Sequence, residues 1–128
     1  MKQIVHNPSE GIYPAPPDYV HAIEVREPSR WLYIAGTMGL DSDGSAPDTL
    51  NAQLELIWRN IRRILAEANM TVDNIVRVTS YLRDASYAAA NGAARVRALG
   101  ERRVPTTAVV VQTLSPDWLV EIEAIAVA

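Results

Sequence analysis

The clearest pattern of hydrophobic positions lies in the middle of the chain, where apolar residues recur at spacings of three and four. This period places them on one face of an α-helix, with Asp48 or Thr49 available as the N-cap. The residues on this face are Leu54, Ile57, Trp58, Ile61, Ile64, Leu65 and Ala68. The alanine-rich stretch 84–103 predicts a second helix that begins near Ser86 and ends around Gly100.

Five other stretches have the period-two alternation or the β-branched and aromatic composition of strands. They are 19–25, 31–35, 75–82, 107–114 and 119–127. The first two look like a hairpin, and the proline-rich stretch 7–18 before them is typical of a loop. The order β-β-α-β-α-β-β, within a single domain of residues 1–128, predicts an α+β fold with one mixed sheet and two helices on one face.

The last predicted strand has two different faces. One face is entirely apolar and suits packing beneath the helices, with Val120, Ile122, Ala124 and Ala126. The other face carries two carboxylates among apolar residues, with Leu119, Glu121, Glu123, Ile125 and Val127. A sheet face open to water is normally more polar than this, so the pattern predicts that another subunit covers it and that a site lies between subunits.

The composition excludes several kinds of functional site and partner. The 128 residues include no cysteine, which excludes disulfides, thiolate metal sites and cysteine nucleophiles. A net charge of -3 and a pI near 5.3 argue against nucleic acid as a partner. No apolar run is long enough for a membrane span or a signal peptide, so we expect a cytoplasmic protein that contacts no membrane. Metal-ligand spacings and glycine-rich nucleotide motifs are absent, so we expect no metal and no cofactor.

Several segments, taken in order, resemble the Rid family, also called YjgF, the reactive intermediate deaminases. They are PPDYVHA at 16–22, AGTMGLDSDG at 35–44, VRVTSYLRD at 76–84 and EIEAIAV at 121–127, together with Gln53, Asn60 and Asn91. The resemblance implies a chorismate-mutase-like fold, a homotrimer and ligand clefts between subunits. It also implies hydrolysis of reactive enamines and imines, such as 2-aminoacrylate, to a keto acid and ammonia.

The resemblance also implies roles for particular residues. Glu121 matches the carboxylate that handles water, although a solvated or interface-paired strand glutamate is the alternative. Tyr19 and Asn91 match substrate-binding positions of the family. The alternative for Tyr19 is a ring that covers the core with its hydroxyl in water, and the alternative for Asn91 is an irregularity in the predicted helix. Gly36 and Thr37 match a segment where glycine lets a ligand or a neighbouring chain approach the backbone.

One position departs from the family pattern. The family's deaminases carry an arginine that binds the substrate carboxylate, and Thr107 stands at that position here, after Pro105 and Thr106. A hydroxyl supplies no positive charge, so we do not expect efficient hydrolysis of 2-aminoacrylate, although Thr107 still counts as a candidate substrate-binding residue. Arg102 and Arg103 lie just upstream, and they either replace the arginine or are cations at a helix end.

Two functions of different classes remain. The first is an enzyme that hydrolyses another imine, enamine or similarly activated small molecule with Glu121. The second is a non-catalytic module that binds or senses a small metabolite in the same cleft. A ribonuclease role ranks last because the chain is acidic. His21 follows Tyr19 closely enough to reach the cleft, but a hydrogen-bonded surface histidine is the simpler interpretation.

Overall fold

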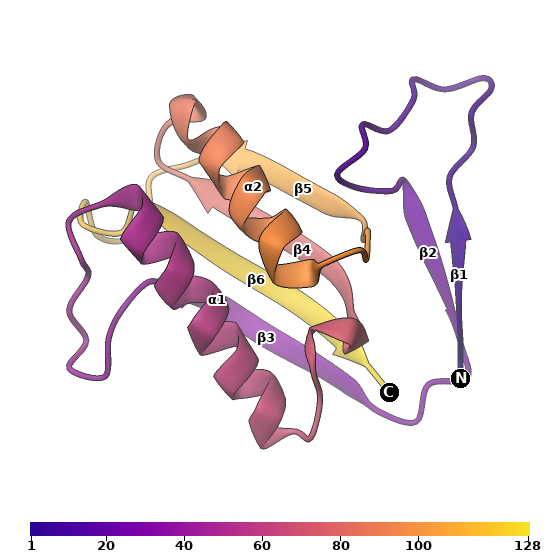
Figure 1. The fold of residues 1–128 in the computed structure, drawn as a ribbon, viewed down its shortest axis with the longest axis horizontal. Helices are drawn as coiled ribbons and strands as arrows, with labels where there is room; N and C mark the ends of the chain where they lie inside the picture. The colour runs from indigo at the N-terminus through magenta and orange to yellow at the C-terminus, as the bar shows by residue number, and fades with distance from the viewer.

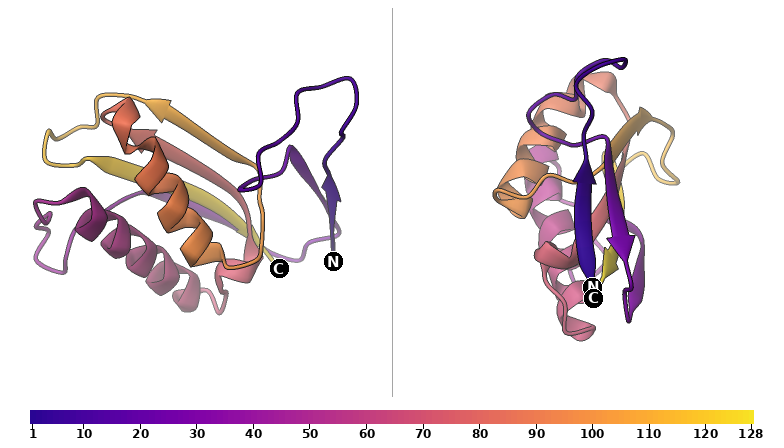
Figure 2. Two further views of the ribbon diagram at one scale, coloured as in Figure 1. Left: turned by 45° about the horizontal axis from the view of Figure 1, so that its top comes forward. Right: turned by 90° about the vertical axis from the view of Figure 1, so that its right-hand side faces the viewer.

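The computed structural model describes residues 1–128 and contains two helices and six strands. In chain order they are β1 (Lys2–His6), β2 (Ala22–Arg26), β3 (Trp31–Met38), α1 (Leu50–Glu67), β4 (Ile75–Leu82), α2 (Ala88–Leu99), β5 (Thr106–Val110) and β6 (Val120–Val127), with short 3-10 turns at Val72–Asn74 and Ala85–Tyr87. Four strands form a sheet of order β3-β6-β4-β5, in which only β4 and β5 are parallel. Both helices cover one face of this sheet (Figures 1 and 2). The α+β prediction is therefore confirmed.

Helix α1 forms where the apolar period predicted it. Thr49 is the N-cap, and its hydroxyl accepts a hydrogen bond from the Ala52 amide at 3.2 Å. The predicted apolar stripe is buried against the sheet, at Leu54, Ile57, Trp58, Ile61 and Leu65. Ile64 belongs to the same period but is exposed. Neither helix is long and apolar enough to cross a membrane.

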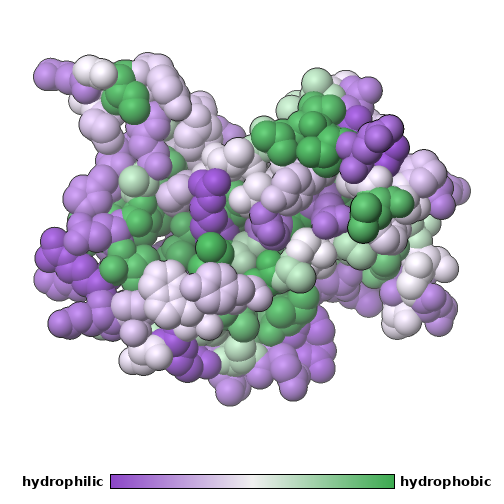
Figure 3. Space-filling view, turned by 180° about the vertical axis from the view of Figure 1, so that it is seen from behind, coloured by the Kyte–Doolittle hydropathy of each residue, from purple (hydrophilic) through white to green (hydrophobic).

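Strands β4 and β6 lie at the centre of the sheet and alternate as predicted. Their buried residues pack beneath the helices, at Val78, Ser80, Leu82, Val120, Ile122, Ala124 and Ala126. The opposite side of the sheet, hereafter the open face, carries the half-buried side chains of Arg77, Thr79, Tyr81, Glu121 and Glu123. Seen from behind the helices, hydrophobic and hydrophilic groups are mixed on the molecular surface (Figure 3).

The predicted hairpin between the first two strands is wrong. Strand β2 pairs with β1, which the sequence analysis did not predict, and the two form a separate antiparallel ribbon beside the main sheet (Figure 1). Glu27 has a φ of 53° and Pro28 lacks an amide hydrogen, so the chain turns away after β2 before β3 begins. Strand β3 pairs with β6 instead, which buries Ile34 in the main core.

A β-bulge interrupts β3 at Ala35 and Gly36. Ile34 pairs with Ala124 and Thr37 pairs with Ile122, so two residues of β3 lie opposite a single residue of β6. The bulge bends β3 beside the carboxylates of β6.

The other boundaries differ only in detail. Strand β3 continues to Met38, and β5 ends at Val110 rather than near Leu114. The end of β5 is set by Arg83, whose Nη1 donates hydrogen bonds to the carbonyl oxygens of Thr113 at 3.0 Å and Ser115 at 3.1 Å. These bonds draw the chain after β5 into a loop instead of a longer strand.

Candidate functional site

The carboxylate of Glu121 lies directly against the bulge in β3. A Cβ atom built on Gly36 would overlap Oε2 of Glu121 and lie 2.9 Å from its Cδ, so only glycine leaves room for this side chain. Glu121 is half-buried, and its carboxylate forms no hydrogen bond or ion pair within the chain. Of the predicted site residues, the structure therefore brings Glu121 and Gly36 together.

Glu123, two positions further along β6, is held by a neighbour. The hydroxyl of Tyr81 donates a hydrogen bond to Glu123 Oε1 at 2.5 Å. This bond, partial burial and the negative charges of Glu123 and Glu121 raise the pKa of Tyr81, although the positive charge of Arg77 acts in the opposite direction. Tyr81 therefore stays protonated at neutral pH, and of the two carboxylates only that of Glu121 has no bonded partner.

A hollow of about 260 Å³ lies over these groups. Gly36, Tyr81, Glu121 and Glu123 line it from the sheet, and residues 111–114 form its wall. The loop that provides this wall is fixed by Arg83 and by Gln53 of α1. Gln53 Nε2 donates to the Asp117 carbonyl at 2.8 Å, and Gln53 Oε1 accepts from the Leu119 amide at 3.0 Å. The hollow is thus built on groups that the fold holds in place.

At the β5 edge of the open face, Thr107 contacts an arginine from the neighbouring strand. Nη2 of Arg77 donates a hydrogen bond to Thr107 Oγ1 at 2.8 Å. The parallel pairing of Thr79 with Thr107 makes this contact possible, because it sets Arg77 and Thr107 on the same face. The alternation of β4 already placed Arg77 on this face, but the parallel register that brings it to Thr107 could not be read from the sequence.

Arg102 and Arg103 do not reach this position. Arg102 Nη2 donates to the Ile75 carbonyl at 2.6 Å and to Gln3 at 3.1 Å, which ties the β1–β2 ribbon to the main sheet. Arg103 donates to the Pro17 and Gly100 carbonyls, each at 2.8 Å. Arg103 therefore acts as a cation at the end of α2, whereas Arg102 fits neither alternative because it binds the first residue of β4.

The remaining predicted binding residues lie away from the Glu121 hollow within one chain. Tyr19 is half-buried, with its ring edge-on to His21 at a centroid distance of 6.4 Å. His21 hydrogen bonds through Nε2 to the Tyr13 carbonyl at 2.9 Å, as expected for a surface histidine. Asn91 is only 1% exposed, and its Oδ1 has no partner. Tyr19 and Asn91 thus belong to the surroundings of α2, where Asp18 forms an ion pair with Arg95 at 2.6 Å.

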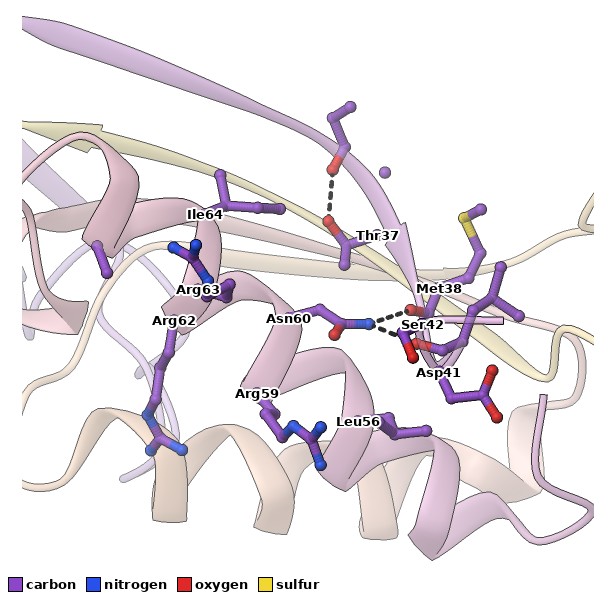
Figure 4. A pocket seen from close by; sticks show the side chains of 14 residues that line it. Thr37, Met38, Asp41, Ser42, Leu56, Arg59, Asn60, Arg62, Arg63 and Ile64 are labelled. Atoms are coloured by element: carbon purple, nitrogen blue, oxygen red, sulfur yellow. Dashed lines mark hydrogen bonds between the residues drawn. The ribbon is translucent and has the colours of Figure 1, made fainter. Parts of the chain in front are cut away.

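Thr37 lines a different and larger hollow, of about 900 Å³, between β3 and α1 (Figure 4). Its hydroxyl donates to the Ala35 carbonyl at 2.9 Å, within its own strand. Asn60 of α1 donates to the carbonyls of Met38 at 3.2 Å and Leu40 at 2.9 Å, and this joins the helix to the end of β3. The side chains of Arg59 and Arg62 point away from Thr37 (Figure 4).

No group of three or more His, Cys, Asp or Glu residues is arranged to hold a metal ion.

Comparison with known proteins places this chain in one family. The family model described as endoribonuclease L-PSP matches residues 12–128. A RutC family protein from Pyrococcus abyssi is 31% identical over 110 residues, which cover 84% of each chain. The crystal structure of YyfB from Yersinia pestis, described as a protein of unknown function of the conserved Rid family, has 30% identity and a TM-score of 0.86, and covers 100% of both chains. RidA from the Antarctic bacterium Psychrobacter sp. PAMC 21119 has 27% identity and a TM-score of 0.73 over 95% of this chain and 94% of that one.

These relatives share the two helices and the mixed sheet, which confirms the expected chorismate-mutase-like fold. Because a family model covers nearly the whole chain and relatives share both its sequence and its fold, the protein belongs to the Rid (YjgF) family.

Proposed function

We propose that this protein hydrolyses the C=N bond of a small imine or enamine, with Glu121 as the residue that handles water. Membership of the Rid family supports a general role in deamination of small metabolites or a related reaction. The observation that carries the proposal is the Glu121 carboxylate, which lies over Gly36 in a hollow and has no bonded partner. A structural glutamate at such a position would be expected to pair, as Glu123 does with Tyr81.

The chemistry needs few groups. Glu121 accepts a proton from water as the oxygen attacks the imine carbon, and a carbinolamine forms. Glu121 returns this proton to nitrogen, the hydroxyl of the carbinolamine then gives its own proton to nitrogen through Glu121, and the C–N bond breaks to leave a carbonyl compound and ammonia. An enamine first becomes the imine by transfer of a proton from nitrogen to carbon. Tyr81 stays neutral beside the site because its pKa is raised, and its hydrogen bond keeps Glu123 from competing for the water. No cofactor is required for this reaction, since the imine carbon is already electrophilic.

The same proposal includes a second copy of the chain over the open face, in a homotrimer with clefts between subunits. Trp31 and Tyr33 stack on one another at 6.4 Å between ring centroids, yet Tyr33 is 73% exposed. Val109 and Val110 are exposed on the edge strand β5. Aromatic and aliphatic side chains on a sheet face and at its edge are typical of surfaces that another chain covers.

The candidate binding residues have different roles in the proposed site. Gly36 provides the space for Glu121, and Thr107 holds Arg77. Tyr19, Thr37 and Asn91 lie outside the Glu121 hollow of their own chain, so they take part in binding only if a second copy brings them to the cleft. A polyanion such as RNA is disfavoured at this face because two carboxylates lie at its centre.

A binding or sensing role without catalysis is the second candidate, and the replacement of the family arginine by Thr107 favours it. The two functions differ in the fate of the ligand. We would incubate the protein with 1-pyrroline-2-carboxylate, a cyclic imine that carries a carboxylate, and follow the imine and its amino keto acid product by NMR. Hydrolysis faster than in buffer supports the enzyme. Saturable binding with the imine recovered unchanged contradicts it and supports the binding module.

A further inference from the structure

We infer that Arg77 binds a carboxylate group of the ligand at the β5 edge of the open face. This inference rests on the proposed function, because it names the chemical class that the same cleft recognises, a small monocarboxylate. Its basis is the environment of the Arg77 guanidinium.

Arg77 is a half-buried cation without an acidic partner. No Asp or Glu lies within ion-pair distance of it, whereas Arg95, the more buried arginine of α2, is paired with Asp18. Its one side-chain hydrogen bond, from Nη2 to Thr107, leaves most of its five N–H donors unused. The guanidinium is only partly exposed to water and has no acidic partner, so its unused donors can bind an anion supplied from outside the chain.

The hydrogen bond to Thr107 also orients the guanidinium. A hydroxyl that accepts from one nitrogen holds that edge of the planar group toward β5, and the other edge remains available for a two-pronged contact with a carboxylate. Thr107 thus acts as a positioning residue for Arg77 and needs no charge of its own.

A hollow of about 260 Å³ adjoins this guanidinium and is separate from the one above Glu121. Arg77, Thr79 and Glu123 supply its polar lining, and Tyr33 and Ile125 supply much of its apolar lining. Glu123 brings a negative charge to the same hollow. A ligand with a second carboxylate would be repelled there, so the lining selects a monocarboxylate with a small apolar body.

The distance to Glu121 shows how the two groups can act on one molecule. Tyr81 lies directly opposite Glu121, and Arg77 is four residues earlier on the same strand, which is about 13 Å of extended backbone. This is the separation along the backbone, and the two side chains line separate hollows. In the proposed homotrimer, a carboxylate held by Arg77 faces the Glu121 of another copy across the open face, and the site is then complete only between subunits.

The test measures binding without turnover. Pyruvate, a three-carbon keto acid of the product class, is titrated against the full-length protein by NMR and by calorimetry. We expect Arg77→Gln to weaken pyruvate binding about tenfold or more, and Arg77→Lys to give an intermediate loss because a lysine keeps the charge but not the fork. Arg59→Gln is the matched control, since Arg59 is an exposed arginine of α1 that forms no hydrogen bond or ion pair. We also expect 2-oxoglutarate to bind more weakly than pyruvate, and Glu123→Gln to reduce that difference.

The inference is overturned if wild-type protein does not bind pyruvate, or if Arg77→Gln binds it as well as Arg59→Gln does. Thermal melting of each variant identifies any loss that comes from unfolding, and in that case Arg77→Lys decides the question. Glu121→Gln separates this inference from the proposed function. Pyruvate binding that depends on Arg77, together with imine turnover that survives Glu121→Gln, would refute the proposed function alone.

Discussion

Gly36→Ala is expected to abolish activity while leaving the fold nearly unchanged. The added Cβ would overlap Oε2 of Glu121 and lie 2.9 Å from Cδ and 3.1 Å from Cγ. These atoms are the flexible end of a side chain, so the carboxylate moves rather than the backbone. A displaced rotamer costs about 0.5–1.5 kcal/mol. The φ of Gly36 is not positive, so alanine fits the backbone at this position. Because alanine restricts the unfolded chain more than glycine does, it also stabilises the folded state by about 0.4–1 kcal/mol. The two contributions nearly cancel in the free energy of unfolding.

The activity should change far more than the stability. A correctly placed general base contributes roughly a hundredfold to ten-thousandfold, and Gly36→Ala removes Glu121 from its position. We therefore expect kcat/KM for imine hydrolysis to fall about a hundredfold or more, close to the effect of Glu121→Ala. The double variant should be no worse than either single variant, because both remove the same interaction. Denaturant unfolding and the initial rate of imine loss measure the two quantities.

Gly100→Ala is the matched control. Gly100 has a φ of 65° at the C-cap of α2, away from the open face, so alanine is strained there and this variant should lose about 1–2 kcal/mol of stability. Its folded fraction should retain activity. The reasoning is refuted if Gly36→Ala keeps wild-type activity, or if the losses from Gly36→Ala and Glu121→Ala multiply in the double variant.

Three further predictions test other parts of the account. The Glu121→Gln variant and the Arg77→Gln variant should each be inactive. When the two variants are unfolded and refolded together, the mixture should regain part of the imine-hydrolysis rate. No recovery would contradict a site between subunits. Asp18→Ala should destabilise the protein by about 1–3 kcal/mol in denaturant unfolding, because it leaves the guanidinium of Arg95 buried and unpaired; an unchanged midpoint would show that the pair contributes nothing. The pKa of Tyr81 is raised above its usual value of 10.0 by its hydrogen bond to a carboxylate, so its stabilising contribution is complete below about pH 10 and is lost as the pH rises through the folded-state pKa. Tyr81→Phe should remove that alkaline loss, and identical pH profiles of unfolding would contradict the assignment.

Local patterns in the sequence were sufficient for the elements that pack against one core. Helix α1 and strands β4 and β6 follow from apolar periods of 3.6 and 2, because each buries a single face. The same alternation identified Glu121 and Glu123 on the open face before their surroundings were known. The resemblance supplied Gly36, and the structure gives it a physical reason, since Glu121 occupies the space of its missing side chain.

The partners of the strands could not be predicted in the same way. The choice of β1 as the partner of β2 depends on a backbone pairing between residues about twenty positions apart, and no local signal in Lys2–His6 marks it. The contact of Arg77 with Thr107 depends on the parallel register of β4 and β5. Arg102 and Arg103 are close to Thr107 in sequence, but they bind backbone carbonyls elsewhere.

The roles of the two carboxylates of β6 are separated by substituting each of them in turn. A pyridoxal-phosphate dehydratase generates reactive imines from hydroxy amino acids in place, and the formation of keto acid and ammonia is followed with wild-type protein, Glu121→Gln and Glu123→Gln. A glutamine at 123 can still accept the hydrogen bond of Tyr81, whereas a glutamine at 121 cannot accept a proton from water. With Arg77 binding the carboxylate in place of the arginine that Thr107 replaces, we predict that wild-type protein accelerates imine loss, that Glu121→Gln removes the acceleration, and that Glu123→Gln keeps most of it. Equal acceleration by wild-type protein and Glu121→Gln would contradict the assignment of Glu121 as the residue that activates water.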